Sequence, residues 1–300
     1  MSRTYGIGIY APAGFAPHPA ALDRAVARLE AMGHRVLVDP TCRARWQRFA
    51  APDAERVAAV VRMATDARVE LVLTLRGGYG WTRLLPYLDF HALAGARKRW
   101  LGYSDFTAFQ LAALSQARMT TFAGPSATGD FGAEVPSAFT VEHCFGLLGA
   151  DSYEVECELD GPAKVAASGT LWGGNLALVA HLVGTKYFPR IDGGILFLED
   201  VGEHPYRVER MLYQLHHAGV LARQRAILLG QFTEYELNAN DGGYDFAGVV
   251  AQLRAVVDVP VFTGFPFGHV PDKLTLPTGG QCALHAGDGR ARLVFSGYGC

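Results

Sequence analysis

The sequence predicts an α/β fold: an N-terminal flavodoxin-like or Rossmann-like parallel sheet, followed by a second, mixed α+β domain. In roughly the first 125 residues, short apolar runs alternate with segments of helical apolar spacing, and glycine or proline turns separate them. Strands that alternate with helices indicate a parallel, doubly wound sheet. The second half contains more short strands and fewer helices, which favours a mixed architecture.

The first sheet is expected to contain five strands, at residues 5–10, 35–38, 70–75, 99–102 and 120–123. Helices are predicted over 19–32, where Leu22, Val26 and Leu29 share one face, and over 53–67. Ligands of such a sheet bind at the carboxyl ends of its strands. The residues that follow these strands are therefore the first candidates for a functional site.

A looser pattern rich in Gly, Pro and Ser covers residues 124–169, around one helical segment at 136–148. We therefore expect an N-terminal domain at 1–135, a linker region at 136–165 and a C-terminal domain at 166–300. The later elements are strand 194–199, helix 204–218, strand 226–231, helix 246–257 and short strands at 261–263, 281–284 and 292–295.

Composition favours a small-molecule or peptide partner. The chain has 300 residues, a net charge of -2 and no long run of like charges, so neither nucleic acid nor a membrane surface is expected as a partner. No signal peptide or 18-residue apolar run is found, which predicts a cytoplasmic protein. The scattered cysteines favour free thiols and no metal cluster, and no cofactor is expected: Cys42, Cys144, Cys157, Cys282 and Cys300.

The strongest local signal is the turn Gly102-Tyr103-Ser104-Asp105, where a strand ends and a helix begins. A serine on such a sharp turn projects its hydroxyl outward, and the N–H groups of the helix start can receive an oxyanion. Phe106 stands where the G-x-S-x-G motif has its second glycine. The alternative interpretation is that Ser104 or Asp105 caps the helix.

A glycine-rich turn, Arg76-Gly77-Gly78-Tyr79-Gly80, directly follows the apolar strand 71–75. Its glycines allow close approach of the backbone to a ligand, as an oxyanion hole or anion site requires. Arg76 could pair with a substrate carboxylate. A glycine-rich βα turn with a solvated arginine is the alternative, and the spacing is not that of a dinucleotide-binding motif.

Two further candidates lie in the second half. Glu199 ends a buried strand on the same side as Phe197, where a carboxylate needs a partner: an imidazole, or a salt bridge to Arg207 or Arg210. His269 lies in a rigid loop of prolines and glycines, a setting typical of catalytic side chains, although a surface histidine is the alternative.

Five motifs in this order resemble the LD-carboxypeptidase family of serine peptidases over nearly the whole chain. They are the turns 76–80 and 102–105, the segment Trp172-Gly173-Gly174-Asn175-Leu176, the strand end 198–200 and Gly268-His269. The resemblance implies Ser104 as nucleophile, Glu199 as the acid and His269 as the base. We expect the backbone N–H groups of Asp105 and Gly78 to form the oxyanion hole, and Arg76 and, more weakly, Asn175 to bind substrate.

The resemblance further implies a homodimer that removes the terminal D-alanine from a murein tetrapeptide in the cytoplasm, through an acyl-enzyme. Since Ser104 lies in the first half and the other two residues in the second, the site is expected at the domain interface. Two alternatives stay open: a microcin-immunity-type peptidase that cleaves a peptidyl-nucleotide, and a non-catalytic α/β peptide-binding protein.

Overall fold

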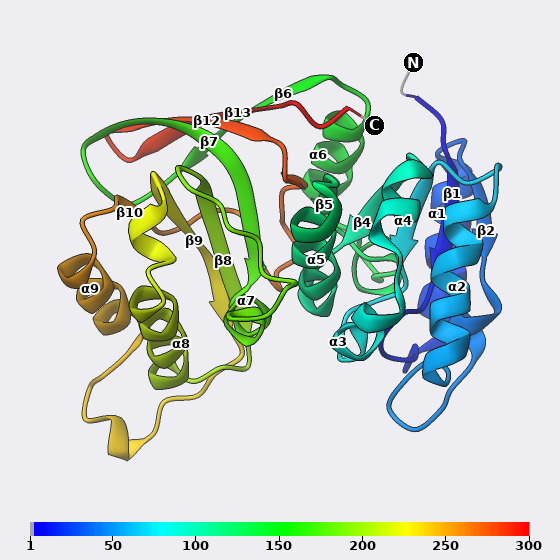
Figure 1. Ribbon diagram of the computed structural model, residues 1–300, viewed down its shortest axis with the longest axis horizontal. Helices are drawn as coiled ribbons and strands as arrows, with labels where there is room; N and C mark the ends of the chain where they lie inside the picture. The colour runs from blue at the N-terminus through cyan, green and yellow to red at the C-terminus, as the bar shows by residue number, and fades with distance from the viewer. Residues whose placement is uncertain (1–2, 300) are drawn as a thin grey trace.

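The computed structural model describes residues 3–299 and contains two sheets that lie side by side (Figure 1). The first sheet has the strand order β11-β5-β4-β3-β1-β2. Its five parallel strands follow the flavodoxin-like order 2-1-3-4-5. They match the expected strands closely: β1 (Gly6–Tyr10), β2 (Arg35–Val38), β3 (Leu71–Thr74), β4 (Arg99–Gly102) and β5 (Thr121–Ala123).

Helices cover both faces of this sheet, as the doubly wound prediction requires. The helix α1 (Pro19–Ala31) buries Leu22 and Leu29 against the face that carries Ile7. On the opposite face, α2 (Asp53–Thr65) and α5 (Thr107–Ala117) pack with Val72 and its neighbours. Two short helices, α3 (Trp81–Leu84) and α4 (Phe90–Gly95), precede β4.

The second sheet is mixed, with the strand order β10-β9-β8-β7-β12-β13-β6. Four neighbouring strands are parallel: β7 (Lys164–Asn175), β8 (Ile195–Val201), β9 (Ala226–Thr233) and β10 (Val261–Phe262). The rest pair antiparallel: β12 (Gln281–Gly287), β13 (Arg290–Ser296) and β6 (Ser152–Glu158). The helices that accompany this sheet are α7 (Leu176–Leu182), α8 (Pro205–His217) and α9 (Phe246–Val256).

Two segments lie differently from the simple division expected along the chain. The region 136–165 contains α6 (Ala138–Leu148) and β6, whose exposed glutamates alternate with buried Val155 and so give little apolar signal. The strand β11 (Leu276–Thr278) lies late in the chain, yet it pairs antiparallel with β5 and completes the first sheet. The division into domains therefore stays a prediction.

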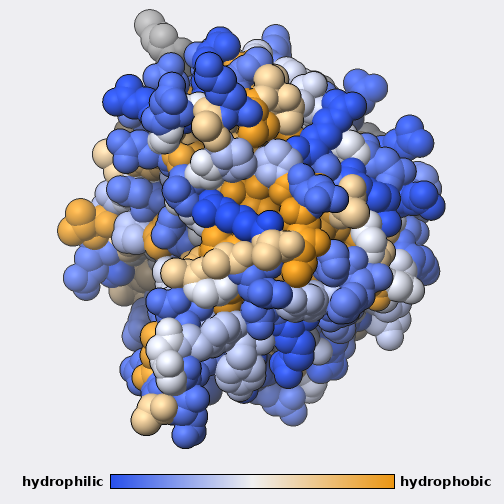
Figure 2. Space-filling view, turned by 90° about the vertical axis from the view of Figure 1, so that its left-hand side faces the viewer, coloured by the Kyte–Doolittle hydropathy of each residue, from blue (hydrophilic) through white to orange (hydrophobic). Residues whose placement is uncertain are grey.

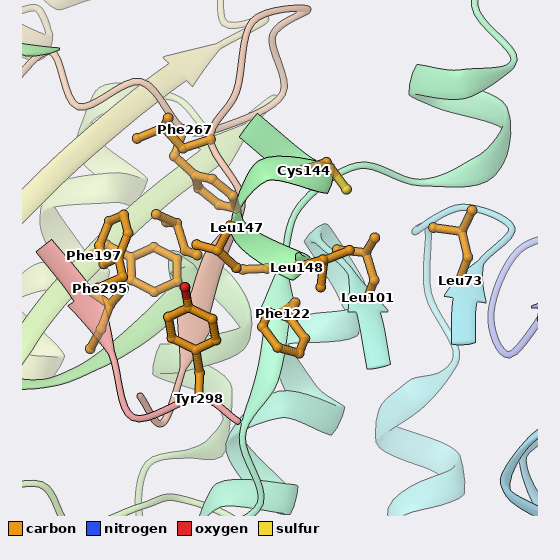
Figure 3. Close-up of a cluster of buried hydrophobic side chains, with 14 of the residues drawn as sticks. Leu73, Leu101, Phe122, Cys144, Leu147, Leu148, Phe197, Phe267, Phe295 and Tyr298 are labelled. Atoms are coloured by element: carbon orange, nitrogen blue, oxygen red, sulfur yellow. The ribbon is translucent and has the colours of Figure 1, made fainter. Parts of the chain in front are cut away.

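Two clusters of buried hydrophobic residues each contain residues from both sheets, and Figure 3 shows part of one of them. Leu73, Leu101 and Phe122 come from the first sheet, and they belong to the same buried cluster as Phe197 and Phe295 of the second. The helix α6 contributes its buried residues between them. Because close-packed interiors deform little, this shared core fixes the position of one sheet relative to the other.

The surface at the second sheet's end of the molecule is mostly hydrophilic around one central area of hydrophobic residues (Figure 2). Among residues 3–299, no helix is both long enough and apolar enough to cross a bilayer.

Candidate active site

A cavity of about 280 Å³ opens at the carboxyl ends of the first sheet's strands. Its walls come from the loops after β1, β3, β4 and β5 and from the loop that precedes β11. Ligands of open parallel sheets bind at this edge. The lining residues are Pro17, His18, Ala21, Arg76, Gly77, Gly78, Tyr103, Ser104, Ser126, Thr128, Gly129 and His269.

Ser104 occupies a strained backbone conformation directly after β4. Its φ of 63° lies in the left-handed region, which costs a non-glycine residue about 1–3 kcal/mol. A Cβ on Gly77 would come within 2.7 Å of Ser104 Cβ and 2.8 Å of its Oγ. Only glycine therefore lets the turn after β3 approach the serine so closely. This is the geometry of a nucleophile elbow.

Phe106 explains why the second glycine of G-x-S-x-G is missing. Its ring is buried and lies 5.8 Å from the ring of Trp81 and 5.2 Å from that of Phe109, measured between centroids. A bulky side chain is accommodated because it fills the core beneath the turn. The first glycine position is tighter, since a Cβ on Gly102 would come within 2.4 Å of Thr74 Oγ1.

The two backbone groups expected as oxyanion donors lie in the turns that meet beside Ser104. A Cβ built on Gly77 would lie 3.6 Å from the backbone nitrogen of Asp105, so the turn after β3 borders the start of the helical segment. Gly78 has a φ of 108°, which favours glycine, and lines the cavity. Their role in binding an oxyanion stays a prediction.

The structure brings Glu199 and His269 together. Glu199, near the end of β8, is 0% exposed, and its Oε2 lies 2.7 Å from Nδ1 of His269. Among residues 3–299, Glu199 forms no salt bridge with Arg207 or Arg210, the local alternative; Arg207 pairs instead with Glu203 at 3.7 Å. With Nδ1 facing the carboxylate, Nε2 is the nitrogen of this cavity-lining ring that is left for proton transfer.

The loop that carries His269 is attached to the segment after β5 by buried polar contacts. Lys273 forms a buried ion pair with Asp130, and its Nζ lies 4.9 Å from the centroid of the Tyr103 ring. Thr140 Oγ1 donates to the carbonyl oxygen of Pro271 at 2.7 Å. The Tyr103 ring in turn lies 4.9 Å from the His269 ring. The imidazole therefore lies between Tyr103, which follows β4 of the first sheet, and Glu199, which lies on β8 of the second.

Asn175, expected as a weak substrate-binding candidate, is 4% exposed and does not line the cavity. Its Nδ2 lies 3.3 Å from Glu199 Oε1 and 2.8 Å from Asp200 Oδ1, and its Oδ1 caps α7 by accepting from Leu178 N. Burial, and then repulsion by Glu199, raises the pKa of Asp200 to about 6. Asn175 therefore lies between two carboxylates rather than beside the cavity.

Arg76 does line the cavity, where Nη1 donates to the carbonyl oxygen of Phe15 at 3.4 Å. Four polar side chains that also line the cavity were missed in the sequence analysis, those of His18, Tyr103, Ser126 and Thr128. A signal was available for them: each follows a strand of the parallel sheet, at the edge where ligands bind.

At the carboxyl edge of a flavodoxin-like sheet, the strained Ser104 turn lines the same cavity as the His269 imidazole, whose Nδ1 contacts the fully buried carboxylate of Glu199. Serine, imidazole and carboxylate are the side-chain types that serine peptidases use. The sequence model of the "LD-carboxypeptidase N-terminal domain" matches residues 7–124, and that of the "LD-carboxypeptidase C-terminal domain" matches residues 168–284. The chain belongs to the LD-carboxypeptidase family.

Individual relatives agree with this assignment. The murein tetrapeptide carboxypeptidase of Pseudomonas aeruginosa is 30% identical, over 88% of this chain and 88% of its own length. The crystal structure of muramoyltetrapeptide carboxypeptidase from Oxalobacter formigenes has a TM-score of 0.92 and 43% identity, covering 99% of this chain and 100% of that one. The microcin C7 self immunity protein MccF has a TM-score of 0.90 at 22% identity, which shows a shared fold.

Proposed function

We propose that the chain is a serine LD-carboxypeptidase that hydrolyses the bond to the terminal D-alanine of cytoplasmic murein tetrapeptides. The observation that carries the proposal is the 2.7 Å contact between Glu199 and His269, whose ring lines the same cavity as the left-handed Ser104. The names of the relatives from Pseudomonas and Oxalobacter support the substrate class.

In this mechanism, Ser104 Oγ attacks the scissile carbonyl while Nε2 of His269 accepts the hydroxyl proton. Glu199 holds the imidazole tautomer and stabilises the imidazolium that forms. The backbone N–H groups of Asp105 and Gly78 bind the oxyanion. His269 then protonates the departing D-alanine nitrogen, and water releases the remaining peptide from the acyl-enzyme.

Arg76 is proposed to bind the terminal carboxylate of the substrate. Its guanidinium borders a cavity that Ser126 and Thr128 also line. Arg76→Ala should raise KM for the tetrapeptide and leave KM for a C-terminal amide analogue nearly unchanged. An unaltered KM and kcat/KM for the free acid would contradict this role.

The role proposed for Asn175 is to position Glu199, because its amide lies between the two buried carboxylates. The homodimer implied by the family resemblance stays a prediction.

The experiment that tests the function compares kcat/KM for three substrates: a muramoyl tetrapeptide ending in D-alanine, the same peptide ending in L-alanine, and a peptidyl-nucleotide. The proposal predicts strong preference for the D-alanine peptide. Faster cleavage of the peptidyl-nucleotide would support the microcin-immunity alternative instead. No cleavage of any of them by folded protein would favour a peptide-binding protein.

A further inference from the structure

The side chain of Asp105 makes a contact that the mechanism above does not use. Asp105 follows the serine and is 1% exposed, and its Oδ2 accepts a hydrogen bond from the backbone N–H of Trp81 at 3.0 Å. Trp81 directly follows the glycine turn 76–80, which approaches Ser104. One carboxyl group therefore joins the serine turn to the far end of the glycine turn.

The glycine turn is held at other points as well. The backbone N–H of Gly14 donates to the carbonyl oxygen of Gly77 at 3.3 Å. At the other end, Nη1 of fully buried Arg56 donates to the carbonyl oxygen of Gly80 at 3.3 Å. Gly78 lies between these fixed points. The direction of its N–H group thus depends on contacts at both ends of the turn.

Burial of this carboxyl is costly. Its other oxygen, Oδ1, is buried without a hydrogen-bond partner among the described residues. Burial raises the pKa of Asp105 to about 7, although the N–H groups of Trp81 and Gly80 and the charge of Arg56 favour the ionised form. Such a cost at the residue beside the serine is consistent with a role in the site.

We propose that Asp105 is a positioning residue whose side chain fixes the glycine turn. Both expected oxyanion donors, its own N–H and that of Gly78, are then held at fixed positions relative to each other. This inference rests on the proposed function, because it assumes that an oxyanion forms at Ser104. Two N–H donors that are already in place stabilise the negative charge of the transition state without having to move, and this lowers the barrier to reaction.

The test measures the second-order rate at which an alkyl fluorophosphonate labels Ser104. In this reaction the Oγ–P bond forms, the P–F bond breaks, fluoride leaves and the hydroxyl proton passes to His269. Negative charge grows on the phosphoryl oxygen in the oxyanion hole, so the rate reports on the donors without a peptide substrate.

Asp105→Ala should slow labelling by about 10²-fold, the size of effect seen when one oxyanion donor is lost. Asp105→Asn keeps an oxygen that can accept from Trp81 N–H and should label within a few-fold of the wild type. With a peptide substrate, Asp105→Ala should lower kcat while KM changes little, which loss of binding alone would not produce.

The matched control is Asp89→Ala. Asp89 accepts from the backbone N–H of Ala92 at 3.0 Å, the same kind of contact at the start of a helix outside the cavity. This variant should melt earlier but label at the wild-type rate. If Asp105→Ala does not fold, Asp105→Ser replaces it, since its shorter side chain also removes the contact to Trp81.

Wild-type labelling rates in folded Asp105→Ala or Asp105→Ser would overturn the inference and leave the proposed function intact. Loss of labelling in Asp105→Asn as large as in Asp105→Ala would also overturn it, because the charge rather than the fixed turn would then matter. A wild-type protein that is not labelled at all would overturn the proposed function, and the inference with it.

Discussion

Nδ1 of His269 lies 2.7 Å from Oε2 of Glu199, although the two residues are 70 positions apart in the chain. The carboxylate is fully buried, whereas the imidazole reaches the cavity. An ionised carboxylate can only accept hydrogen bonds, so this contact selects the tautomer with its proton on Nδ1.

Glu199→Gln should therefore lower kcat by about 10³–10⁴-fold, because a glutamine can favour the wrong tautomer and no longer stabilises the imidazolium. KM should change only a few-fold. Steady-state release of D-alanine gives both constants. The control is Glu203→Gln, whose carboxylate pairs with Arg207 and which should retain activity. Equal activity in the two variants would argue against the role of Glu199.

Gly77→Ala should lower kcat/KM by at least about 100-fold, an effect comparable to the loss of a donor, because the added Cβ would come within 2.7 Å of Ser104 Cβ. Gly77 has no left-handed φ, so the effect is steric rather than one of backbone strain. Gly95→Ala is the matched control, since a Cβ there meets nothing within 4 Å. An active Gly77→Ala enzyme would mean that the serine turn is not constrained as described.

Asn175→Ala should reduce the free energy of unfolding by about 1–3 kcal/mol, because two buried carboxylates lose a shared donor. If Asn175 positions Glu199, kcat should fall by about tenfold, which corresponds to 1.4 kcal/mol, with KM nearly constant. Kinetics and urea unfolding on the same preparation test both effects. A raised KM with unchanged kcat would instead support the substrate-binding role that the sequence suggested.

The raised pKa of Asp200 predicts how the free energy of unfolding depends on pH. Its pKa in the folded protein is raised to about 6 from 3.8, first by burial and then by Glu199. Because the folded pKa exceeds the unfolded one, its contribution to stability is complete below 3.8 and is lost as the pH rises through about 6.

The asparagine in Asp200→Asn does not ionise, so this pH-dependent loss of stability does not occur in the variant. The difference in unfolding free energy between variant and wild type should shift in the variant's favour by roughly 2–3 kcal/mol between about pH 4 and pH 8. Urea unfolding at several pH values measures this difference directly. In the wild type, Ala177 N donates a hydrogen bond of 2.9 Å to Asp200 Oδ2. Any free energy lost with this bond in the variant is the same at every pH, so it does not change how the difference varies with pH. A difference independent of pH would contradict the account.

The sequence could predict the parts of the fold that short-range patterns determine. Four of the five parallel strands of the first sheet are predictable because a strand that is mostly buried on both faces forms an apolar run, as in Leu71–Thr74. The edge strand β2 is less buried, but its Val-Leu-Val run gives the same signal. The strand β6 was missed because Glu154, Glu156 and Glu158 alternate with its few apolar residues. The pairing of β11 with β5 joins residues about 150 positions apart, and no local pattern carries such information.

The candidate site was predictable to a similar extent. Ser104, Arg76 and His269 could be found because each lies in a turn or loop whose glycines and prolines mark it as unusual, and all three line the cavity. The place of Asn175 between two carboxylates depends on the parallel pairing of β7 with β8, which brings it opposite Glu199. The ion pair of Lys273 with Asp130 likewise depends on tertiary structure alone.

The most direct test of the proposed function is release of free D-alanine from a purified muramoyl tetrapeptide by the wild-type protein and by Ser104→Ala. We predict release by the wild type and none above background by the variant, with both proteins folded. Equal release by the two proteins, or none by the wild type, would contradict it.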